Sequence, residues 1–220
     1  MSKRVGWLLV IVASILSALP ALDLWRVLRL MNQDWVKAFS YPVFDLGIKV
    51  TGAWALIFLF LTLACSPVQR LLSLIWPGTR WPGSLRRTVG LFAFFYCLLH
   101  LLFYLAVGQK WRWDYVWEDA FLEKSRLPGW GAIFLLLPLA LTSTDSMVRR
   151  LGGKFWKRLH FLVFPAIALA IWHQTWTEKQ AGTNDYHRAT YAMCAFGILI
   201  LARLLPKLRR TIATRLLRAR

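Results

Sequence analysis

Four histidines are the side chains of this 220-residue chain best suited to binding a metal or relaying a proton: His100, His160, His173 and His187. Three of them stand within long apolar stretches, and His160 and His173 share one, HFLVFPAIALAIWHQTW. Ionisable groups are costly to place in lipid and usually mark function there. His187 falls in the polar segment DYHRAT, which predicts an exposed outer loop and no ligand role.

The elements that must position these rings are apolar runs of transmembrane length. Hydrophobic residues make up 58% of the chain, and several runs reach the ~20 residues that cross a hydrocarbon core about 30 Å thick. Backbone groups in lipid must be satisfied internally, which predicts helices. We therefore expect an all-α integral membrane protein, one domain over residues 1–220, with six transmembrane helices at 5–22, 50–66, 89–107, 130–144, 159–176 and 189–205.

Two of these runs, 130–144 and 5–22, differ from an ordinary transmembrane helix in length or in position. Residues 130–144 are short, and we expect Gly129 and the hydroxyl residues 142–144 to extend the helix at its two ends. Residues 5–22 have the length of a span and a poor signal-peptide cleavage site because of Pro20, which favours a retained first helix.

The distribution of charge predicts the orientation. The formal net charge is +18. With the N-terminus inside, the inner segments hold 18 basic residues against one acid, Asp145, whereas the outer segments hold ten against nine. This asymmetry follows the positive-inside rule, so we expect both termini on the inner side. It also argues against a nucleic-acid binder, whose charge would gather on one folded face. Residues 206–220 are predicted to form a basic cytoplasmic tail on anionic lipid.

The loops and the cysteines give weaker indications of function than the histidines do. The outer loops 23–49 and 108–128 are long enough for partial helices, and KWRWDYVWEDAFLEK predicts an aromatic and acidic surface that lies on the membrane or docks a partner. The three cysteines, Cys65, Cys97 and Cys194, form no CxxC pair, which favours neither zinc nor a disulfide.

Depth in the bilayer decides which histidines can meet. His100 lies 13 residues beyond the inner Arg87, about 20 Å at helical rise, and His173 lies 15 residues beyond the inner Arg158, about 22 Å. Two neutral imidazoles at one depth on different helices are suited to a haem with one axial ligand on each side of the iron. Zinc would require three or four ligands. A proton relay would use acids as well, and no predicted span has an acid in its middle.

His160 is only two residues from Arg158 and is expected near the inner face. Thirteen residues at 100° each leave His160 and His173 220° apart, but Pro165 between them can kink or locally widen the helix and change that angle. Arg86, 14 residues before His100, falls within 40° of the same face at the depth of His160. Arg86 is either an inner anchor or a support for a second haem held by His160, through propionate contacts or as an unusual ligand.

The runs RRTVGLFAFFYCLLHLLFY, LALTSTDSMVRRLGGKFWKRLHFLVF, IWHQTW and VTGAWAL resemble the MsrQ (YedZ) family over residues of about 45 to 205. These proteins are haem-binding membrane subunits of periplasmic methionine sulfoxide reductase systems, within a ferric-reductase-like transmembrane group that includes NADPH oxidases. The group places two histidines on each of two helices. His100, His160 and His173 match three of these positions, and Arg86 stands at the fourth, as in MsrQ proteins.

The resemblance therefore implies one or two haems b, with His100, His173 and His160 as metal ligands and Arg86 as a further cofactor-binding residue. FMN is implied by the resemblance alone. The expected role is an electron-transfer subunit in the bacterial inner membrane, not the sulfoxide reductase itself. The electron donor would be the quinol pool or a cytoplasmic flavin reductase, because no oxidase-type FAD and NADPH domain is recognised. The acceptor would be a periplasmic molybdopterin methionine sulfoxide reductase, which repairs oxidised proteins.

Two rival functions stay open. One is a ferric or quinone reductase of the same fold with another acceptor. The other is a non-redox transporter or scaffold whose histidines are structural. A haem spectrum separates the second rival from the redox functions.

Overall fold

The computed structural model describes residues 41–75, 83–123, 125–180 and 187–218, and the isolated residues Leu22, Trp25 and Arg29. Within the four ranges, side chains are described for 46–75, 85–123, 125–177 and 190–205. The regular structure of this part is all helical, as predicted: α4 (Tyr41–Ile75), α5 (Gly83–Phe103), the π-helical turn η1 (Tyr104–Gly108), α6 (Trp113–Leu122), α7 (Arg126–Leu141), α8 (Asp145–Leu151), α9 (Gly153–Leu159), the 3₁₀ turn η2 (His160–Leu162), α10 (Val163–Gln180) and α11 (His187–Arg218).

Three stretches of the described chain are long and apolar enough to cross a bilayer: Leu46–Ile75, Leu85–Gly108 and Gly153–Thr177. They contain the predicted spans 50–66, 89–107 and 159–176. The bent pair α7 and α8 makes a fourth if it is taken as one span, and α11 contributes a shorter apolar helix over Thr190–Leu205. The predicted helix 5–22 lies outside the described residues. The number of six spans and the orientation with both ends inside therefore stay predictions.

The fourth predicted span differs from expectation at its C-terminal end. The helix does begin before Gly129, at Arg126, but it ends at Leu141 and residues 142–144 do not extend it. The Thr142 hydroxyl donates to the Pro138 carbonyl and the Ser143 hydroxyl to that of Leu139, both at 2.6 Å, so side chains satisfy the last turn. The chain then turns by 91° into α8. Local hydroxyl bonds of this kind compete with helix propagation.

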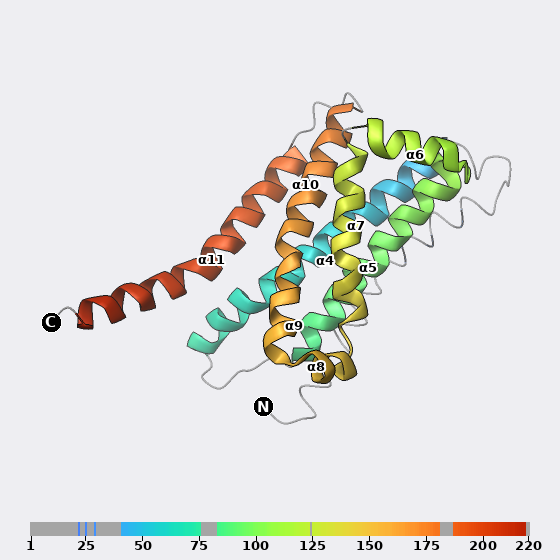
Figure 1. Ribbon diagram of the computed structural model, residues 1–220. Helices are drawn as coiled ribbons and strands as arrows, with labels where there is room; N and C mark the ends of the chain where they lie inside the picture. Colours follow the sequence, from blue (N-terminus) through green and yellow to red (C-terminus); the bar gives the residue numbers. More distant parts are fainter. Residues whose placement is uncertain are drawn as a thin grey trace.

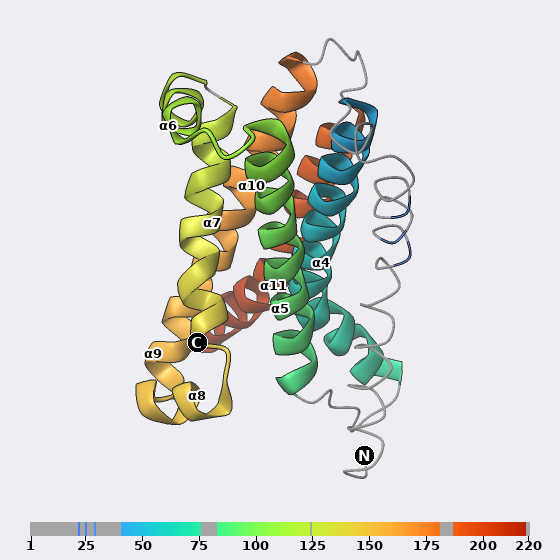
Figure 2. The same cartoon turned by 90° about the vertical axis from the view of Figure 1, so that its right-hand side faces the viewer.

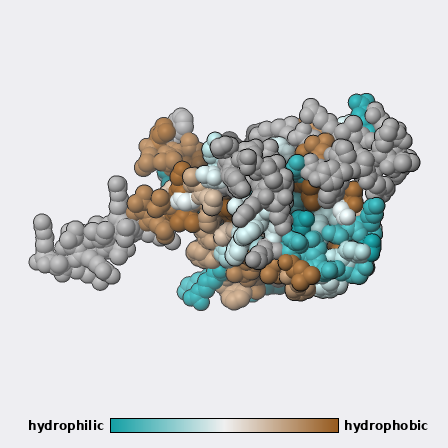
Figure 3. Space-filling model, turned by 90° about the horizontal axis from the view of Figure 1, so that it is seen from above, coloured by the Kyte–Doolittle hydropathy of each residue, from teal (hydrophilic) through white to brown (hydrophobic). Residues whose placement is uncertain are grey.

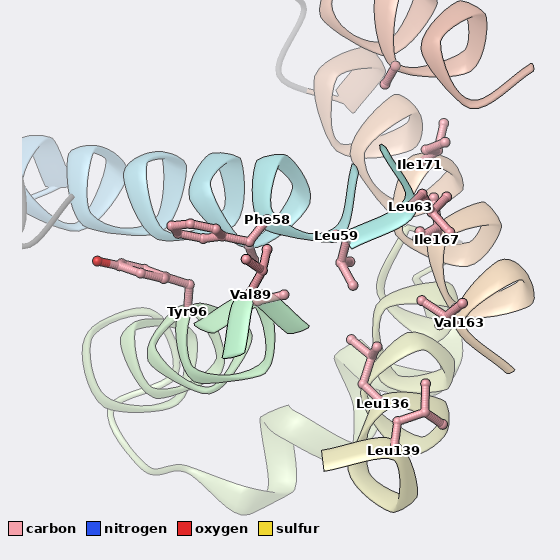
Figure 4. Packing of buried hydrophobic residues seen from close by; sticks show 14 residues of the cluster. Phe58, Leu59, Leu63, Val89, Tyr96, Leu136, Leu139, Val163, Ile167 and Ile171 are labelled. Carbon is pink, nitrogen blue, oxygen red and sulfur yellow. The ribbon is translucent and has the colours of Figure 1, made fainter. Parts of the chain in front are cut away.

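The transmembrane helices pack as two pairs. α4 lies mainly against α5, and α7 mainly against α10, with fewer contacts between the pairs (Figures 1 and 2). Buried side chains from all four helices meet in one core, in which Phe58 of α4 stacks on Tyr96 of α5 with ring centres 5.5 Å apart. Leu63 of α4 and Ile167 of α10 lie close together and are fully buried (Figure 4). This core joins the two pairs near the middle of the bundle.

Short helices mark the two ends of the bundle. α6 lies across one end, whereas α8 and α9 lie at the other (Figures 1 and 2). Seen from the α6 end, hydrophilic residues gather on one side of the surface and hydrophobic residues on the side from which α11 leaves (Figure 3). Large apolar side chains such as Leu61, Phe95 and Phe134 are exposed on the flanks of the bundle. Such a surface is expected of helices that face lipid.

Candidate functional site

His100 of α5 and His173 of α10 lie face to edge, with ring centres 6.0 Å apart and ring planes at 80°. The two residues are 73 positions apart in sequence and come from different helix pairs. Their meeting agrees with the equal depth predicted from their spacing to Arg87 and Arg158. The structure thus brings together the two rings that the sequence singled out.

The ring of His100 is fixed by α4. Its Nδ1–H donates to the carbonyl oxygen of Ile48 at 2.9 Å. A Cβ atom added to Gly52 would lie 2.9 Å from that same nitrogen. Because a helical side chain leans back over the preceding turn, residue i+4 normally covers the carbonyl of residue i. Glycine at position 52 is what lets the imidazole reach the Ile48 carbonyl.

The ring of His173 is fixed in the same way by the start of α7. Its Nδ1–H donates to the carbonyl oxygen of Ser125 at 2.5 Å, and a Cβ atom on Gly129 would lie 3.0 Å from Nδ1. Gly129 again follows the accepting residue by four positions. We call each such arrangement, a carbonyl at position i with a glycine at i+4, a glycine latch. The two latches bind the two rings to α4 and α7.

The latches determine which nitrogen of each ring is free. A carbonyl only accepts, so the proton of each neutral imidazole lies on Nδ1 and the lone pair lies on Nε2. Metal-ligating histidines have this arrangement, with the second nitrogen bound to a carbonyl or carboxylate. Bonds of about 2.0–2.1 Å from metal to imidazole nitrogen put two rings on opposite sides of one metal about 6 Å apart between centres. The observed spacing of the pair therefore fits a haem with two axial imidazoles.

A polar cluster adjoins the pair at the α6 end. Arg126 is close enough to act electrostatically on both imidazoles, and its Nε–H donates to Asp119 at 3.1 Å. The Asp119 carboxylate also accepts the hydroxyl of Tyr104 at 2.5 Å, and Gln109 donates to both Tyr104 and Asp119. Arg126 is thus a cation held beside the histidine pair by residues of α6 and η1. The position of Arg126 was not predicted, because the aromatic and acidic pattern of KWRWDYVWEDAFLEK gives no pairing for it.

His160 lies in a different environment at the opposite end of the same span. Its Nδ1–H donates to the carbonyl of Trp156 at 3.0 Å, four residues earlier on its own helix. Its ring stacks on the Trp156 indole, with ring centres 3.9 Å apart. The Trp156 Nε1–H in turn donates to the Thr142 carbonyl at 2.8 Å, which fixes the indole. His160 Nε2 is buried and has no hydrogen-bond partner.

A cavity of about 70 Å³ lies beside His160. Both Arg86 and Arg87 line it, together with Thr62, Gly90, Ser143 and Trp156. Both arginines act electrostatically on His160. Arg87 also forms an ion pair with Asp145 at the start of α8, whereas Arg86 lies near Cys65. The prediction that Arg86 lies at the depth of His160 agrees with this placement. An unpartnered imidazole nitrogen is suited to a metal ligand.

The angle between His160 and His173 changes through a tightening of the helix, whereas the prediction named a kink or a widening. His160–Leu162 form the 3₁₀ turn η2 between α9 and α10, and Pro165 falls in the first turn of α10, where its missing N–H is tolerated. A 3₁₀ turn advances about 120° per residue instead of 100°, so three such residues add roughly 60°. The predicted 220° becomes roughly 280°, which brings the two rings nearer to one face.

Two further predictions concern His187 and the loop 108–128. His187 is the first residue of α11 and not part of a loop; its side chain lies outside the described residues. The outer loop 108–128 contains α6, in agreement with the expected partial helix. Across the described residues no group of three or more histidine, cysteine, aspartate or glutamate side chains gathers in a way that suits a metal ion. Within this part of the chain, the His100 and His173 pair is therefore the candidate donor set of the central site.

Comparison with known proteins gives a consistent result. The model of the family "Ferric reductase like transmembrane component" matches residues 51–171. A protein-methionine-sulfoxide reductase heme-binding subunit MsrQ from Rhodospirillum rubrum is 43% identical over 159 residues, which are 72% of this chain and 72% of that protein. MsrQ proteins of Herminiimonas arsenicoxydans and Deinococcus radiodurans are each 40% identical, over 70% of this chain and 67% and 71% of theirs.

The family model covers more than half of the chain, including His100 and His160, and stops two residues before His173. The relatives match at 36% identity or better over most of the chain. The resemblance inferred from the sequence is thus confirmed. The chain belongs to the ferric-reductase-like transmembrane family and, within it, to the MsrQ proteins.

Proposed function

We propose that the chain is a membrane cytochrome b that carries electrons across the inner membrane to a periplasmic molybdopterin methionine sulfoxide reductase. The observation that carries the proposal is the His100 and His173 pair, with ring centres 6.0 Å apart and both Nδ1 atoms bound to backbone carbonyls. The printed names of the relatives, which call those proteins heme-binding subunits of a methionine sulfoxide reductase, support it.

In this proposal the residues of the chain bind, orient and shield a haem. His100 and His173 would hold the haem iron through Nε2, and the glycine latches keep both Nε2 lone pairs available and both rings in one orientation. Arg126 would supply a charge-assisted hydrogen-bond donor for the propionate groups of the haem. Haem bound there supplies one-electron redox chemistry, whose potential depends on the axial ligands, burial and nearby hydrogen bonds. The apolar core between the helix pairs keeps water from the site.

A second haem at His160 is the next part of the proposal. The unpartnered Nε2 of His160 and the cation Arg86 at the same cavity suit such a group by their chemistry. The cavity of about 70 Å³ is smaller than the roughly 300–1,000 Å³ of ordinary ligand pockets. Its lining side chains would have to move apart to admit a porphyrin. His160 and Arg86 would hold this second group, which would supply a further one-electron redox site at the α8 and α9 end of the bundle.

The donor and acceptor follow from the proposed orientation. With both termini inside, α8, α9 and His160 face the cytoplasm, where quinol or a flavin reductase would deliver electrons, and α6 faces the periplasmic acceptor. The FMN implied by the resemblance stays a prediction, which flavin fluorescence of the purified chain checks. The chain itself would transfer electrons and leave the sulfoxide chemistry to its partner, whose reaction restores the apolar thioether of methionine.

A reduced-minus-oxidised absorption spectrum, with haem counted per chain, tests the proposal. We expect a b-type spectrum and at least one haem per chain in the purified membrane protein. Protein that folds and shows no reducible b-type absorbance would falsify the redox function and leave the transporter or scaffold.

A ferric or quinone reductase is the second candidate, because the matching family model describes ferric-reductase-like components in general. Copurification separates the two. A periplasmic molybdoenzyme retained by the chain, and reduced through it, supports the sulfoxide reductase system. Reduction of ferric chelates or quinone by a haem-loaded chain that retains no such partner supports the alternative.

A further inference from the structure

A proline in α4 creates a backbone acceptor that α11 uses. Pro67 lies inside α4 and is buried. Proline has no N–H, so the carbonyl four residues earlier, that of Leu63, loses its helical donor. Arg203 of α11 fills this vacancy, since its Nη2–H donates to the Leu63 carbonyl oxygen at 2.7 Å across 140 positions of sequence. The bond fixes both the guanidinium of Arg203 and the contact of α11 with α4.

The fixed guanidinium has spare binding capacity. It lies 5.4 Å from the ring centre of Phe164 of α10, so contacts with α4 and α10 hold it from two sides. Its Nε–H is nevertheless buried and has no hydrogen-bond partner. A buried donor without an acceptor is costly. An oxygen-bearing ligand would supply the acceptor.

The surroundings of Arg203 are positively charged. The charged groups that act on it are Arg86 of α5 and Arg70 of α4, and the thiol of Cys65 is the remaining neighbour with an electrostatic effect. No carboxylate is among these partners. Arg86 and Arg70 both act electrostatically on Arg203. The Arg203 guanidinium, fixed on the Leu63 carbonyl and with its Nε–H unpartnered, would therefore be stabilised by an anion beside it.

Apolar side chains next to these arginines indicate what kind of anion would fit. Arg70 and Arg203 lie between large exposed hydrophobic residues on the same two helices: Val68, Leu71, Leu74 and Ile75 of α4, and Leu201, Leu204 and Leu205 of α11. A cationic centre bordered by an apolar surface suits a molecule with an anionic head and hydrocarbon chains. Basic sites between transmembrane helices on the cytoplasmic side bind acidic lipids in this way.

We propose that the junction of α4, α5 and α11 binds the phosphate group of an acidic phospholipid, held by Arg203, Arg86 and Arg70. The guanidinium groups donate charge-assisted bonds to the phosphate oxygens, and the lipid tails lie on the exposed leucines of α4 and α11. The site goes beyond electron transfer and needs no haem. Arg86 also lines the cavity beside His160, whereas Arg203 and Arg70 take no part in either proposed haem site. Loss of lipid binding in variants of Arg203 or Arg70, with haem content unchanged, is therefore distinguishable from failure of the electron-transfer proposal.

Native mass spectrometry of the full-length chain, delipidated in detergent and offered phosphatidylglycerol or phosphatidylcholine, tests the proposal. We expect one retained phosphatidylglycerol, not replaced by phosphatidylcholine. Arg203→Gln should weaken retention about tenfold, the effect of one lost charge-assisted bond of ~1.4 kcal/mol. Arg203→Lys keeps the charge and should retain more lipid than Arg203→Gln. Arg150→Gln, which removes an exposed charge from α8, is the matched control and should retain lipid as the wild type does.

Arg70→Gln leaves the bond between Arg203 and Leu63 intact. If Arg203→Gln does not fold, Arg70→Gln is the variant that tests lipid binding. It should lower retention several-fold. Equal retention of the two lipids, or an equal loss in Arg150→Gln, overturns the proposal. Displacement of phosphatidylglycerol by FMN would show that the arginines hold a phosphate of a soluble cofactor, and the lipid assignment would then be wrong.

Discussion

The two ends of the α9–α10 span hold their histidines by different means. His173, with His100 facing it, is bound to a carbonyl of another helix over a glycine. His160 is bound to a carbonyl of its own helix and stacked on the tryptophan that carries it. The positions of the His100 and His173 rings, towards the α6 end, thus depend on the packing of four helices. The position of the His160 ring, at the α9 end, depends on one turn of chain.

This difference bears on how rigid each site is. A ligand held by tertiary contacts moves only if helices move, and the pair is ready for a metal at the observed spacing. His160, which is held by local contacts, keeps its rotamer but faces no second imidazole among the described residues, and Arg86 lines the same cavity. The outer site is expected to bind haem more strongly than the inner one.

The largest expected effect is removal of an outer ligand. His100→Ala or His173→Ala should abolish the outer haem completely, because each leaves the iron without one axial ligand. His160→Ala should spare it and lower only the remaining haem content. Haem per chain and the low-temperature spectrum of the reduced protein measure both. His187→Ala is the control and should match the wild type. Full haem content in both outer variants would remove the ligand assignment.

The glycine latches come next in size. Gly52→Ala or Gly129→Ala puts a methyl group about 3 Å from the imidazole nitrogen, an overpacking that costs about 1–3 kcal/mol. We expect partial loss of haem and a lower thermal midpoint. Gly197→Ala in α11, where an added Cβ meets nothing within 4 Å, is the matched control. It should leave the haem content unchanged and should not lower the thermal midpoint, since alanine is the better helix former. If all three variants behave alike, the latches do not position the rings.

A smaller effect is expected at Arg126. Arg126→Gln removes a cation beside the outer pair, so the reduced form loses stabilisation and the midpoint potential should fall. A fall of roughly 40 mV, equivalent to about 1 kcal/mol for one electron, is expected. Redox titration measures it at unchanged haem content. Arg87→Gln, paired with Asp145 at the other end of the bundle, should shift the outer potential less. An equal shift in both would contradict the local role.

The smallest effect concerns the ion pair of Arg87 with Asp145. The Asp145 side chain is 73% exposed, and exposed pairs contribute about 0.2–1 kcal/mol. Asp145→Asn should lower the thermal midpoint slightly, less so at high salt, and leave the spectrum unchanged. A larger fall of the thermal midpoint, accompanied by loss of the haem absorbance that depends on His160, would mean that the site at His160 depends on α8.

Residue spacing predicted the meeting of His100 and His173 because the rise of a helix is constant and both depths could be counted from inner arginines. It also predicted that Arg86 would share the depth of His160. The latches escaped prediction because they join a side chain to a backbone carbonyl of a distant helix, and their trace in the sequence is a single glycine. The end of α7 at Leu141 escaped because hydroxyl side chains took its last carbonyls.

The packing of the helices as two pairs gives the histidines a role in assembly. His100 links α5 to α4, and His173 links α10 to α7, so each latch closes one pair. An iron bound by both rings would cross-link the two pairs where direct contacts are fewer. A group that binds only the assembled bundle stabilises it by mass action. Haem supply would then determine how much of this protein survives proteolysis in the membrane, before any electron is transferred.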